Sequence, residues 1–227
     1  MTHILNETFD AVYVLNLDRR ADRWEECKEI AHSCGLTLDR LSGIDGAKLK
    51  EEEVALGMGR YIPQGDIRGA QGCALSHYAA VKKAQEEGRK SVLIFEDDFE
   101  FVDNFENLFA EYYKQVPVDW EFLYLGANHN THALSPGGPI TLPLISKNVG
   151  KPLRSYCLHA YAIKESLYDY ILSLFDVEVT QAPVDVTISQ VHPSMKTCYA
   201  FSPSLVTQRD GYSDIGRKEV SYKPYIL

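Results

Sequence analysis

The stretch Ser91-Val92-Leu93-Ile94-Phe95-Glu96-Asp97-Asp98 indicates the fold class of this 227-residue chain. Its first five residues are typical of a buried strand, and three carboxylates follow directly at the carboxyl end. In open α/β sheets, ligands bind beyond the carboxyl ends of the strands. Carboxylate oxygens at that edge suit Mg²⁺ or Mn²⁺. The stretch therefore predicts a divalent-metal site for a phosphate-bearing substrate. The alternative interpretation is a solvated acidic turn that opens the next loop.

Strands and helices alternate around this stretch, which predicts an α/β fold with a mostly parallel sheet flanked by helices. Residues 11–17 are typical of a central strand, and residues 20–34 have apolar side chains at helical spacing before Gly35. Further strands are expected at 38–41, 122–125, 156–163 and 197–201, and further helices at 73–87, 105–115, 165–175 and 184–191. Residues 57–72 are expected to form a loop. Because the chain shows no repeat and no linker, a single domain over residues 1–227 is expected.

Composition limits the partners of the chain. Its 32 acidic and 23 basic side chains give a net charge of −9, so no general affinity for nucleic acid is expected. The first residues lack a secretory signal pattern, and no apolar run reaches membrane-spanning length, so no transmembrane span is expected. The cysteines lack a C-x-x-C pair and are expected to be reduced thiols of a cytoplasmic protein: Cys27, Cys34, Cys73, Cys157 and Cys198.

A cationic turn follows the first predicted strand. Asn16-Leu17-Asp18-Arg19-Arg20 precedes Arg23 at the start of a helix, where guanidinium groups and free amides suit phosphate. Asp18 is a candidate acceptor for ribose hydroxyls or a base. A parallel sheet brings this turn and the acidic turn to the same edge. Together they predict a nucleoside diphosphate bridged to the protein by a metal, whereas local charge pairs at a surface helix are the alternative for the arginines.

A third motif, Gly69-Ala70-Gln71-Gly72-Cys73-Ala74-Leu75-Ser76-His77, begins the helix before the acidic strand. Its two glycines permit a close approach of the backbone to a ligand. Ser76 and His77 bring a hydroxyl and an imidazole near the start of that helix. A core histidine with a backbone partner is the alternative for His77, but its position before the acids favours a function.

These motifs resemble those of glycosyltransferase family 25, which holds lipooligosaccharide galactosyltransferases of bacteria and the collagen galactosyltransferases. The resemblance rests on Asn16-Leu17-Asp18-Arg19-Arg20-x-x-Arg23, Gly72-Cys73-Ala74-Leu75-Ser76-His77 and Leu93-Ile94-Phe95-Glu96-Asp97-Asp98, in that order. Ile44-Asp45-Gly46 lies between the first two blocks. A looser resemblance continues over residues 122–126, 160–163 and 183–185, so that it covers residues 11–215 in all.

The resemblance implies a GT-A-like, Rossmann-related fold and an inverting transfer from a UDP-sugar, usually with Mn²⁺, for which Mg²⁺ is the alternative. Carried onto this chain, it implies that Asp98 binds the metal and that Glu96 or Asp97 orients the ribose or a metal-bound water. The donor side would also include Asn16, Leu17, Asp18, Arg19, Arg23, Ser76 and His77. The donor-binding half would cover residues 8–126, and the acceptor-side half residues 127–227.

Inversion requires a base on the acceptor hydroxyl, and Asp185 is the candidate. Pro183 stiffens the entry to a predicted helix and presents Asp185 in its first turn, where the helix dipole should keep it ionised. In the alternative interpretation, the Asp185 carboxylate only stabilises the helix dipole. Glu96 and Asp97 are then the alternative candidates for the base. A further metal ligand is expected from the C-terminal segment, with four candidates: His192, Gln208, Asp210 and Asp214.

The expected reaction moves a hexose to a glycan or to a hydroxylated protein acceptor. Galactose and glucose are the first candidates for this hexose. Nucleotidyl or phosphoryl transfer at the same acidic metal site is one alternative. A phosphatase with an aspartate nucleophile is disfavoured, because Asn16-Leu17-Asp18 lacks the Asp-x-Asp pattern at the first strand. A non-catalytic module that binds a nucleotide sugar or a glycan is the other alternative, against which the intact Glu96-Asp97-Asp98 argues.

Overall fold

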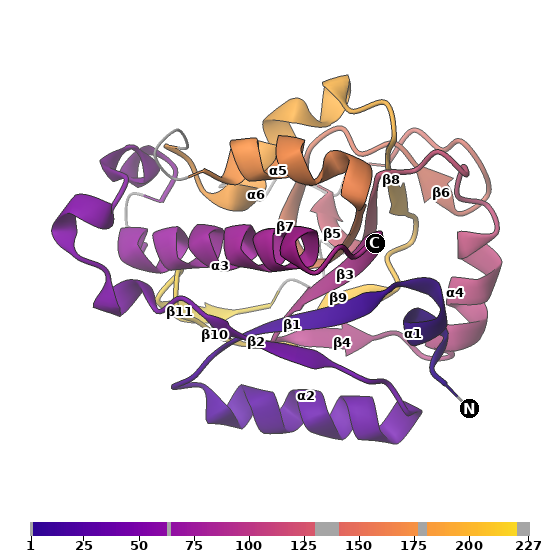
Figure 1. Cartoon of the computed structure of the whole chain (residues 1–227), viewed down its shortest axis with the longest axis horizontal. Helices are drawn as coiled ribbons and strands as arrows, with labels where there is room; N and C mark the ends of the chain where they lie inside the picture. Colours follow the sequence, from indigo (N-terminus) through magenta and orange to yellow (C-terminus); the bar gives the residue numbers. More distant parts are fainter. Residues whose placement is uncertain (1, 63–64, 130–140, 177–180, 222–227) are drawn as a thin grey trace.

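A seven-stranded sheet forms the centre of the computed structural model, which describes residues 2–62, 65–129, 141–176 and 181–221 (Figure 1). The strand order is β2-β1-β3-β7-β5-β8-β6. Strands β2, β1, β3, β5 and β8 run in one direction, and β7 and β6 run in the other. The predicted α/β class with a mostly parallel sheet is therefore confirmed. The strands span Ala11–Leu17 (β1), Asp39–Gly43 (β2), Ser91–Glu96 (β3), Phe122–His129 (β5), Val149–Gly150 (β6), Ser155–Lys164 (β7) and Cys198–Phe201 (β8).

Helices cover both faces of this sheet, and each face has its own apolar core. In β3, Val92 and Ile94 face one core while Leu93 and Phe95 face the other, because successive side chains of a strand point to opposite sides. A central strand that is buried on both faces therefore has a continuous run of apolar residues in its sequence. One face holds α3 (Ile67–Glu86), α5 (Tyr168–Phe175) and α6 (Val184–Val191), and the other holds α1 (Ile4–Thr8), α2 (Ala21–Cys34) and α4 (Phe105–Tyr113).

The parallel pairing of β1 with β3 brings the cationic and acidic turns to one edge of the sheet. Leu15 is the register partner of Glu96, so the residues that follow each strand leave the sheet side by side. The chain then forms a short strand, β4 (Phe99–Phe101), which pairs with β9 (Val206–Gln208) of the C-terminal segment. The sequence-based expectation that both turns share one edge is confirmed.

Strand β7 joins the two halves of the sheet, since it pairs with β3 on one side and β5 on the other. Its register with β5 shifts around Gly126, and Cys157 lies at this irregularity with a φ angle of 64°. A non-glycine residue in the left-handed region is strained and is often found at functional sites.

Several short elements, and the start of α3, differ from what the sequence predicts. Residues 57–72 do not form one loop. Helix α3 already begins at Ile67, where the Asp66 side chain accepts a hydrogen bond from the Arg68 amide. Three-residue strands carry too little pattern to be recognised, and the segment after β9 contains two, β10 (Gly211–Ser213) and β11 (Lys218–Val220). The remaining short helices are η1 (Gly46–Lys48), η2 (Glu51–Glu53), η3 (Leu56–Arg60), η4 (Glu165–Leu167) and η5 (His192–Ser194). Within the described ranges, no helix is long and apolar enough to cross a membrane.

Gly72 serves packing within the protein, which differs from the predicted approach to a ligand. A Cβ atom at this position would lie 2.7 Å from the Gly46 amide nitrogen and still closer to the Ile44 carbonyl oxygen. Helix α3 therefore contacts the Ile44-Asp45-Gly46 backbone directly. This close contact explains why the segment Ile44-Asp45-Gly46 and the facing part of α3 both contain a glycine.

We expect Gly72→Ala to destabilise the protein by about 2–4 kcal/mol, because neither backbone can move aside without disturbing the packing. Gly69→Ala is the matched control on the same helix, since its Cβ would meet only the Asp66 side chain at 3.4 Å. Alanine also favours helix formation, so the control should be neutral or slightly stabilising. Urea unfolding of both variants measures the difference, and equal midpoints would contradict the packing argument.

Candidate active site

Asp97 holds the acidic turn to the cationic turn. One carboxylate oxygen accepts a hydrogen bond from Arg23 Nη1 at 2.7 Å, and the other accepts one from Asn16 Nδ2 at 2.7 Å. The residue is 7% exposed. Two strong partners and this burial make Asp97 the structural link between β1 and β3 at the sheet edge. A direct contact of Asp97, Asn16 or Arg23 with a donor stays a prediction.

Asp98 lies beside Gln208 and carries an incompletely compensated charge. Gln208 Nε2 lies 3.3 Å from both carboxylate oxygens, and Arg23 Nη1 lies 3.6 Å from one of them. Burial, with the neighbouring charge of Glu96, raises the pKa of Asp98 to about 7. Gln208 Oε1 is buried and has no hydrogen-bond partner in the described part of the chain. A carboxylate and an unpaired amide oxygen at one place suit a hard divalent cation.

Glu96 is held by a buried chain of polar groups. His77 Nε2 lies 3.3 Å from Glu96 Oε1, and His77 Nδ1 lies 3.0 Å from the Tyr161 hydroxyl. With Nε2 protonated, His77 donates to Glu96 and accepts from Tyr161. Burial opposes ionisation of Glu96, but the hydrogen bond from His77, together with nearby positive charge such as that of Arg23, outweighs burial and lowers the pKa of Glu96. Glu96 therefore keeps its charge, while Asp98 lacks a comparable partner.

Cys73 also belongs to this region, although from the sequence it was expected only to be a reduced thiol. One ligand atom each from Cys73, His77 and Glu96 lie within 4.8 Å of one another. Cys73 precedes His77 by four residues on α3, and this spacing on one helix face is the sequence signal that could have found it. Ser76, in contrast, donates to the Gly72 carbonyl and accepts from the Ile44 amide, so its hydroxyl supports packing. A donor contact of Ser76 stays a prediction.

Asp185 lies in the first turn of α6, as predicted, and faces β7. Its carboxylate accepts hydrogen bonds from the Cys157 amide at 3.2 Å and from the Val186 amide at 2.8 Å. Burial raises the pKa of Asp185, and the charge of Glu96 adds to this, even though the amide bonds oppose it. The ionised state of Asp185, expected from its place in the first turn of the helix, stays a prediction. A raised pKa suits a general base.

The arginines of the cationic turn are already paired within the protein. Arg19 contacts Asp45 at 3.3 Å and Asp214 at 3.2 Å, and Arg20 contacts Asp22 at 2.9 Å and Asp214 at 3.3 Å. Asp214 therefore ties the segment after β10 to the first strand. The predicted acceptor-side half thus contributes residues directly to the donor-side turn.

A pocket of about 290 Å³ opens beside this turn. It lies between the end of β1 and the segment from the end of β2 to η2, and its lining residues are Asp18, Arg19, Gly43, Ile44, Asp45, Lys48, Leu49 and Glu53. Asp18 accepts hydrogen bonds from Ser42 and Arg40, which lower its pKa, so it stays ionised at the rim. Leu17 ends β1 opposite Gly43. An ionised acceptor at the rim of a pocket suits ribose hydroxyls or a base.

Of the four candidate metal ligands from the C-terminal segment, only some lie near the acids that follow β3. Gln208 contacts Asp98, whereas Asp214 pairs with the arginines and Asp210 is exposed. His192 is buried, and its Nε2 lies 3.0 Å from the Tyr124 hydroxyl in the core covered by α3, α5 and α6. The core interpretation therefore fits His192.

Two buried histidines predict a loss of stability in acid. Burial lowers the pKa of His192 to about 3 and that of His129 to about 4. Because the unfolded chain binds a proton near pH 6.5 and the folded chain does not, stability falls as the pH drops below that value. Between pH 7 and pH 5 each histidine should cost about 2 kcal/mol.

His192→Gln should therefore reduce the difference in unfolding free energy between pH 7 and pH 5 by about 2 kcal/mol, as measured by urea unfolding at both pH values. The exposed His32 on α2 provides the control variant, His32→Gln, which should leave the difference unchanged. An unchanged difference in His192→Gln would mean that His192 is protonated in the folded protein.

Comparison with known proteins identifies relatives for the first part of the chain. The sequence model described as glycosyltransferase family 25 (LPS biosynthesis protein) matches residues 9–137. Procollagen galactosyltransferase 1 of Danio rerio is 31% identical over 134 residues, which are 52% of this chain and 21% of that protein. The inactive glycosyltransferase 25 family member 3 of Homo sapiens is 29% identical over 133 residues, which are 52% of this chain and 22% of that protein.

The matched segment thus spans 21–22% of the length of these relatives. Among solved structures, a glycosyltransferase involved in glycosylation of the major capsid of PBCV-1 aligns with a TM-score of 0.42 at 11% identity. That alignment covers 83% of this chain and 80% of the other.

Proposed function

The chain belongs to glycosyltransferase family 25, and we propose that it transfers a hexose, galactose or glucose, from a UDP-sugar to a hydroxyl of a glycan or protein. The proposed transfer inverts the anomeric carbon and requires Mn²⁺ or Mg²⁺. The observation that carries this proposal is the meeting of Glu96, Asp98 and Gln208 at the sheet edge that also holds the pocket beside Asp18. The free thiols support a cytoplasmic location, which is likewise a proposal.

The proposed role of each residue follows from its surroundings in the site. Asp98, with Gln208 and Glu96, would hold the metal ion, which supplies positive charge to the leaving diphosphate. His77 and Tyr161 keep Glu96 oriented and ionised. The pocket beside Asp18 and Arg19 would receive the nucleoside, and the ionised Asp18 would accept bonds from its hydroxyls.

Asp185 would take the proton from the acceptor hydroxyl as the new bond forms. The Cys157 and Val186 amides fix the orientation of its carboxylate. Its raised pKa makes it a stronger base than an exposed aspartate.

A binding-only role is the second candidate, because a human relative of similar identity is named an inactive family member. Hydrolysis of a UDP-sugar by the purified chain separates the two roles. Turnover of one UDP-sugar with Mn²⁺ supports the enzyme. Binding without turnover of any UDP-sugar supports the binding-only role.

We expect UDP to bind at least about tenfold more tightly with Mn²⁺ than with EDTA. The reason is that Arg19, Arg20 and Arg23 already pair with carboxylates, and the net charge of −9 opposes a free diphosphate. Calorimetric titration in both conditions measures the ratio. Uridine, which has no phosphate, is the control ligand and should bind independently of the metal. Equal UDP affinities in the two conditions would contradict the metal bridge.

A further inference from the structure

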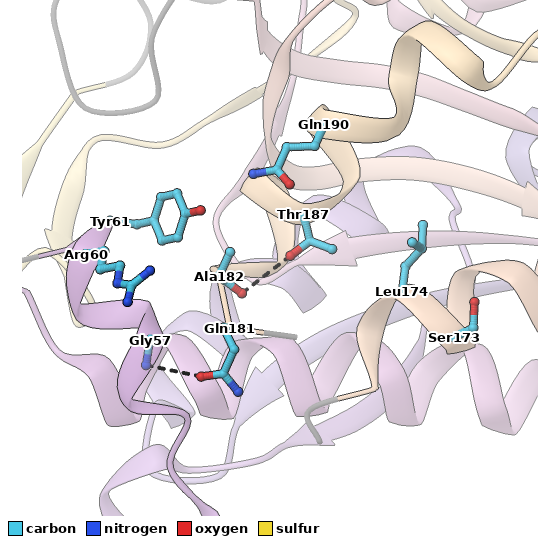
Figure 2. Close-up of a pocket in the computed structure, with 9 residues that line it drawn as sticks. All are labelled: Gly57, Arg60, Tyr61, Ser173, Leu174, Gln181, Ala182, Thr187 and Gln190. Carbon is cyan, nitrogen blue, oxygen red and sulfur yellow. Dashed lines mark hydrogen bonds between the residues drawn. The ribbon is translucent and has the colours of Figure 1, made fainter. Parts of the chain in front are cut away.

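A second pocket, of about 380 Å³, opens between η3, the end of α5 and helix α6 (Figure 2). Figure 2 shows Arg60 and the ring of Tyr61 on one side, facing Gln190 and Thr187 of α6. Gln181 lies between the two sides at the entry to α6. Polar side chains and apolar surface both line the pocket, and the ring of Tyr61 is its aromatic part.

The polar groups of this pocket keep unused hydrogen-bonding capacity. In the parts of the chain that the structure describes, Arg60 forms no ion pair and the Gln190 amide forms no hydrogen bond. Gln181 Oε1 accepts from the Gly57 amide at 3.3 Å, which leaves the Gln181 amino group available as a donor. These exposed groups bond to water in the free protein, and they are available to bond a polar ligand instead.

The chemistry of the lining matches a saccharide with a negative charge. A tyrosine ring offers an apolar face to the C–H groups of a sugar ring, and the glutamine amides can bond its hydroxyls. An unpaired guanidinium adds bidentate recognition of a carboxylate or a phosphate. The pocket beside Asp18 already provides the place for a nucleoside, so the donor does not require this second pocket.

Helix α6 connects this pocket to the candidate base. Asp185 lies in the first turn of α6, and Gln190 lies five residues later, about 7.5 Å along the helix axis. Tyr61 packs against Tyr156, Ala182 and Val186, and Tyr156 precedes Cys157, whose amide bonds the Asp185 carboxylate. Thr187 and Gln190 lie on the face of α6 turned away from Asp185, so the pocket and the base are neighbours around the start of α6, where Gln181 and Ala182 line the pocket.

We propose that this pocket is the acceptor subsite and that it binds a saccharide carrying an anionic group. Arg60 pairs with the anion and Tyr61 packs on the sugar ring, while the reacting hydroxyl belongs to another part of the same acceptor, which reaches Asp185 around the first turn of α6. This proposal rests on the proposed glycosyl transfer for its role, but its binding chemistry can be tested without any donor.

The test measures binding of three probes to the full chain by saturation-transfer NMR titration. Glucuronic acid and glucose 6-phosphate distinguish a carboxylate from a phosphate, and glucose lacks the charge. We expect at least one of the two anions to bind more tightly than glucose, and Arg60→Met to weaken that anion roughly tenfold or more. Tyr61→Leu, which keeps apolar packing, should weaken all three probes to a similar extent.

Arg89→Met is the control for loss of a guanidinium elsewhere, because Arg89 pairs with Glu87 just before β3, at the opposite end of the sheet from the acids. It should not change the binding of any probe. UDP affinity with Mn²⁺ is measured on Arg60→Met as well and should equal that of the unmodified chain. An absence of UDP binding in the unmodified chain would refute the proposed function without affecting the probe titrations.

Three results would overturn the acceptor subsite: equal binding of glucose and both anions, equal anion binding by the unmodified chain and Arg60→Met, or displacement of the bound anion by UDP. The acceptor subsite is supported if Arg60→Met loses the preference for an anion over glucose and Arg89→Met retains it. With a working acceptor, Arg60→Met should then raise the acceptor KM while kcat changes little, since Arg60 binds a part of the acceptor that does not react.

Discussion

Asp98→Asn is expected to lower metal-dependent turnover of a UDP-sugar by at least about 100-fold, while the melting temperature stays the same or rises. Asparagine keeps the shape of the side chain but lacks the charge that a hard cation requires. The fold should tolerate the change, because Asp98 lies close to the charge of Glu96 and burial already disfavours its ionisation. Removing one of two neighbouring carboxylates relieves repulsion in the metal-free protein.

Hydrolysis of the UDP-sugar with Mn²⁺ and a thermal melt without metal test this expectation together. Asp103→Asn, at an exposed acid in the turn before α4, is the control and should change neither quantity. Turnover retained in Asp98→Asn would remove Asp98 from the metal site. A large drop in melting temperature would instead mean that the carboxylate stabilises the fold through Gln208 and Arg23.

Asp185→Asn should lower sugar transfer by about 10²–10⁴-fold and leave UDP affinity nearly unchanged, because positioned base catalysis contributes that much. The asparagine oxygen can still accept one of the two amide bonds, from Cys157 or from Val186. Some loss of stability at the start of α6 is therefore expected, about 1 kcal/mol as for a helix cap.

Transfer with a working acceptor and UDP affinity are measured on the same variant. Asp169→Asn is the matched control, since Asp169 is the acidic residue in the first turn of the neighbouring helix α5 and bonds Gln85. It should change stability slightly and transfer not at all. Near-normal transfer by Asp185→Asn would exclude Asp185 as the base, and a parallel loss of UDP binding would assign it to the donor side.

The central strands and their shared edge could be predicted because a strong local pattern encodes them. Strands β1 and β3 are buried on both faces, so their apolar runs are continuous, and the parallel order places the following turns together. Helix α6 was predicted with the same bounds as observed, since Pro183 marks its start. The first turn of α3 was missed because its glycines suit a loop, and only the contact with Ile44-Asp45-Gly46 explains them.

The division of roles among the three acids could not be predicted, because it depends on partners far along the chain. Asp97 meets Arg23, Asp98 meets Gln208, and Glu96 meets His77. Three adjacent carboxylates look equivalent in the sequence, although one forms an ion pair, one carries a raised pKa and one is hydrogen-bonded to a histidine. The pairing of Arg19 and Arg20 with Asp214 crosses almost 200 residues and leaves no local signal.

The place of β7 in the sheet has a consequence for the order in which the chain folds. As synthesis proceeds, β1, β2 and β3 can pair as soon as they emerge, whereas β5 must wait until β7 has followed it. Pairings between such distant segments form slowly, since the loop between them must close first. The acids after β3 are therefore made early, but Gln208 and Asp185 reach them only after β7 has joined the two half-sheets. A partly folded chain lacks the Gln208 partner of Asp98 and has an open sheet edge, and such an edge favours aggregation until the last third is complete.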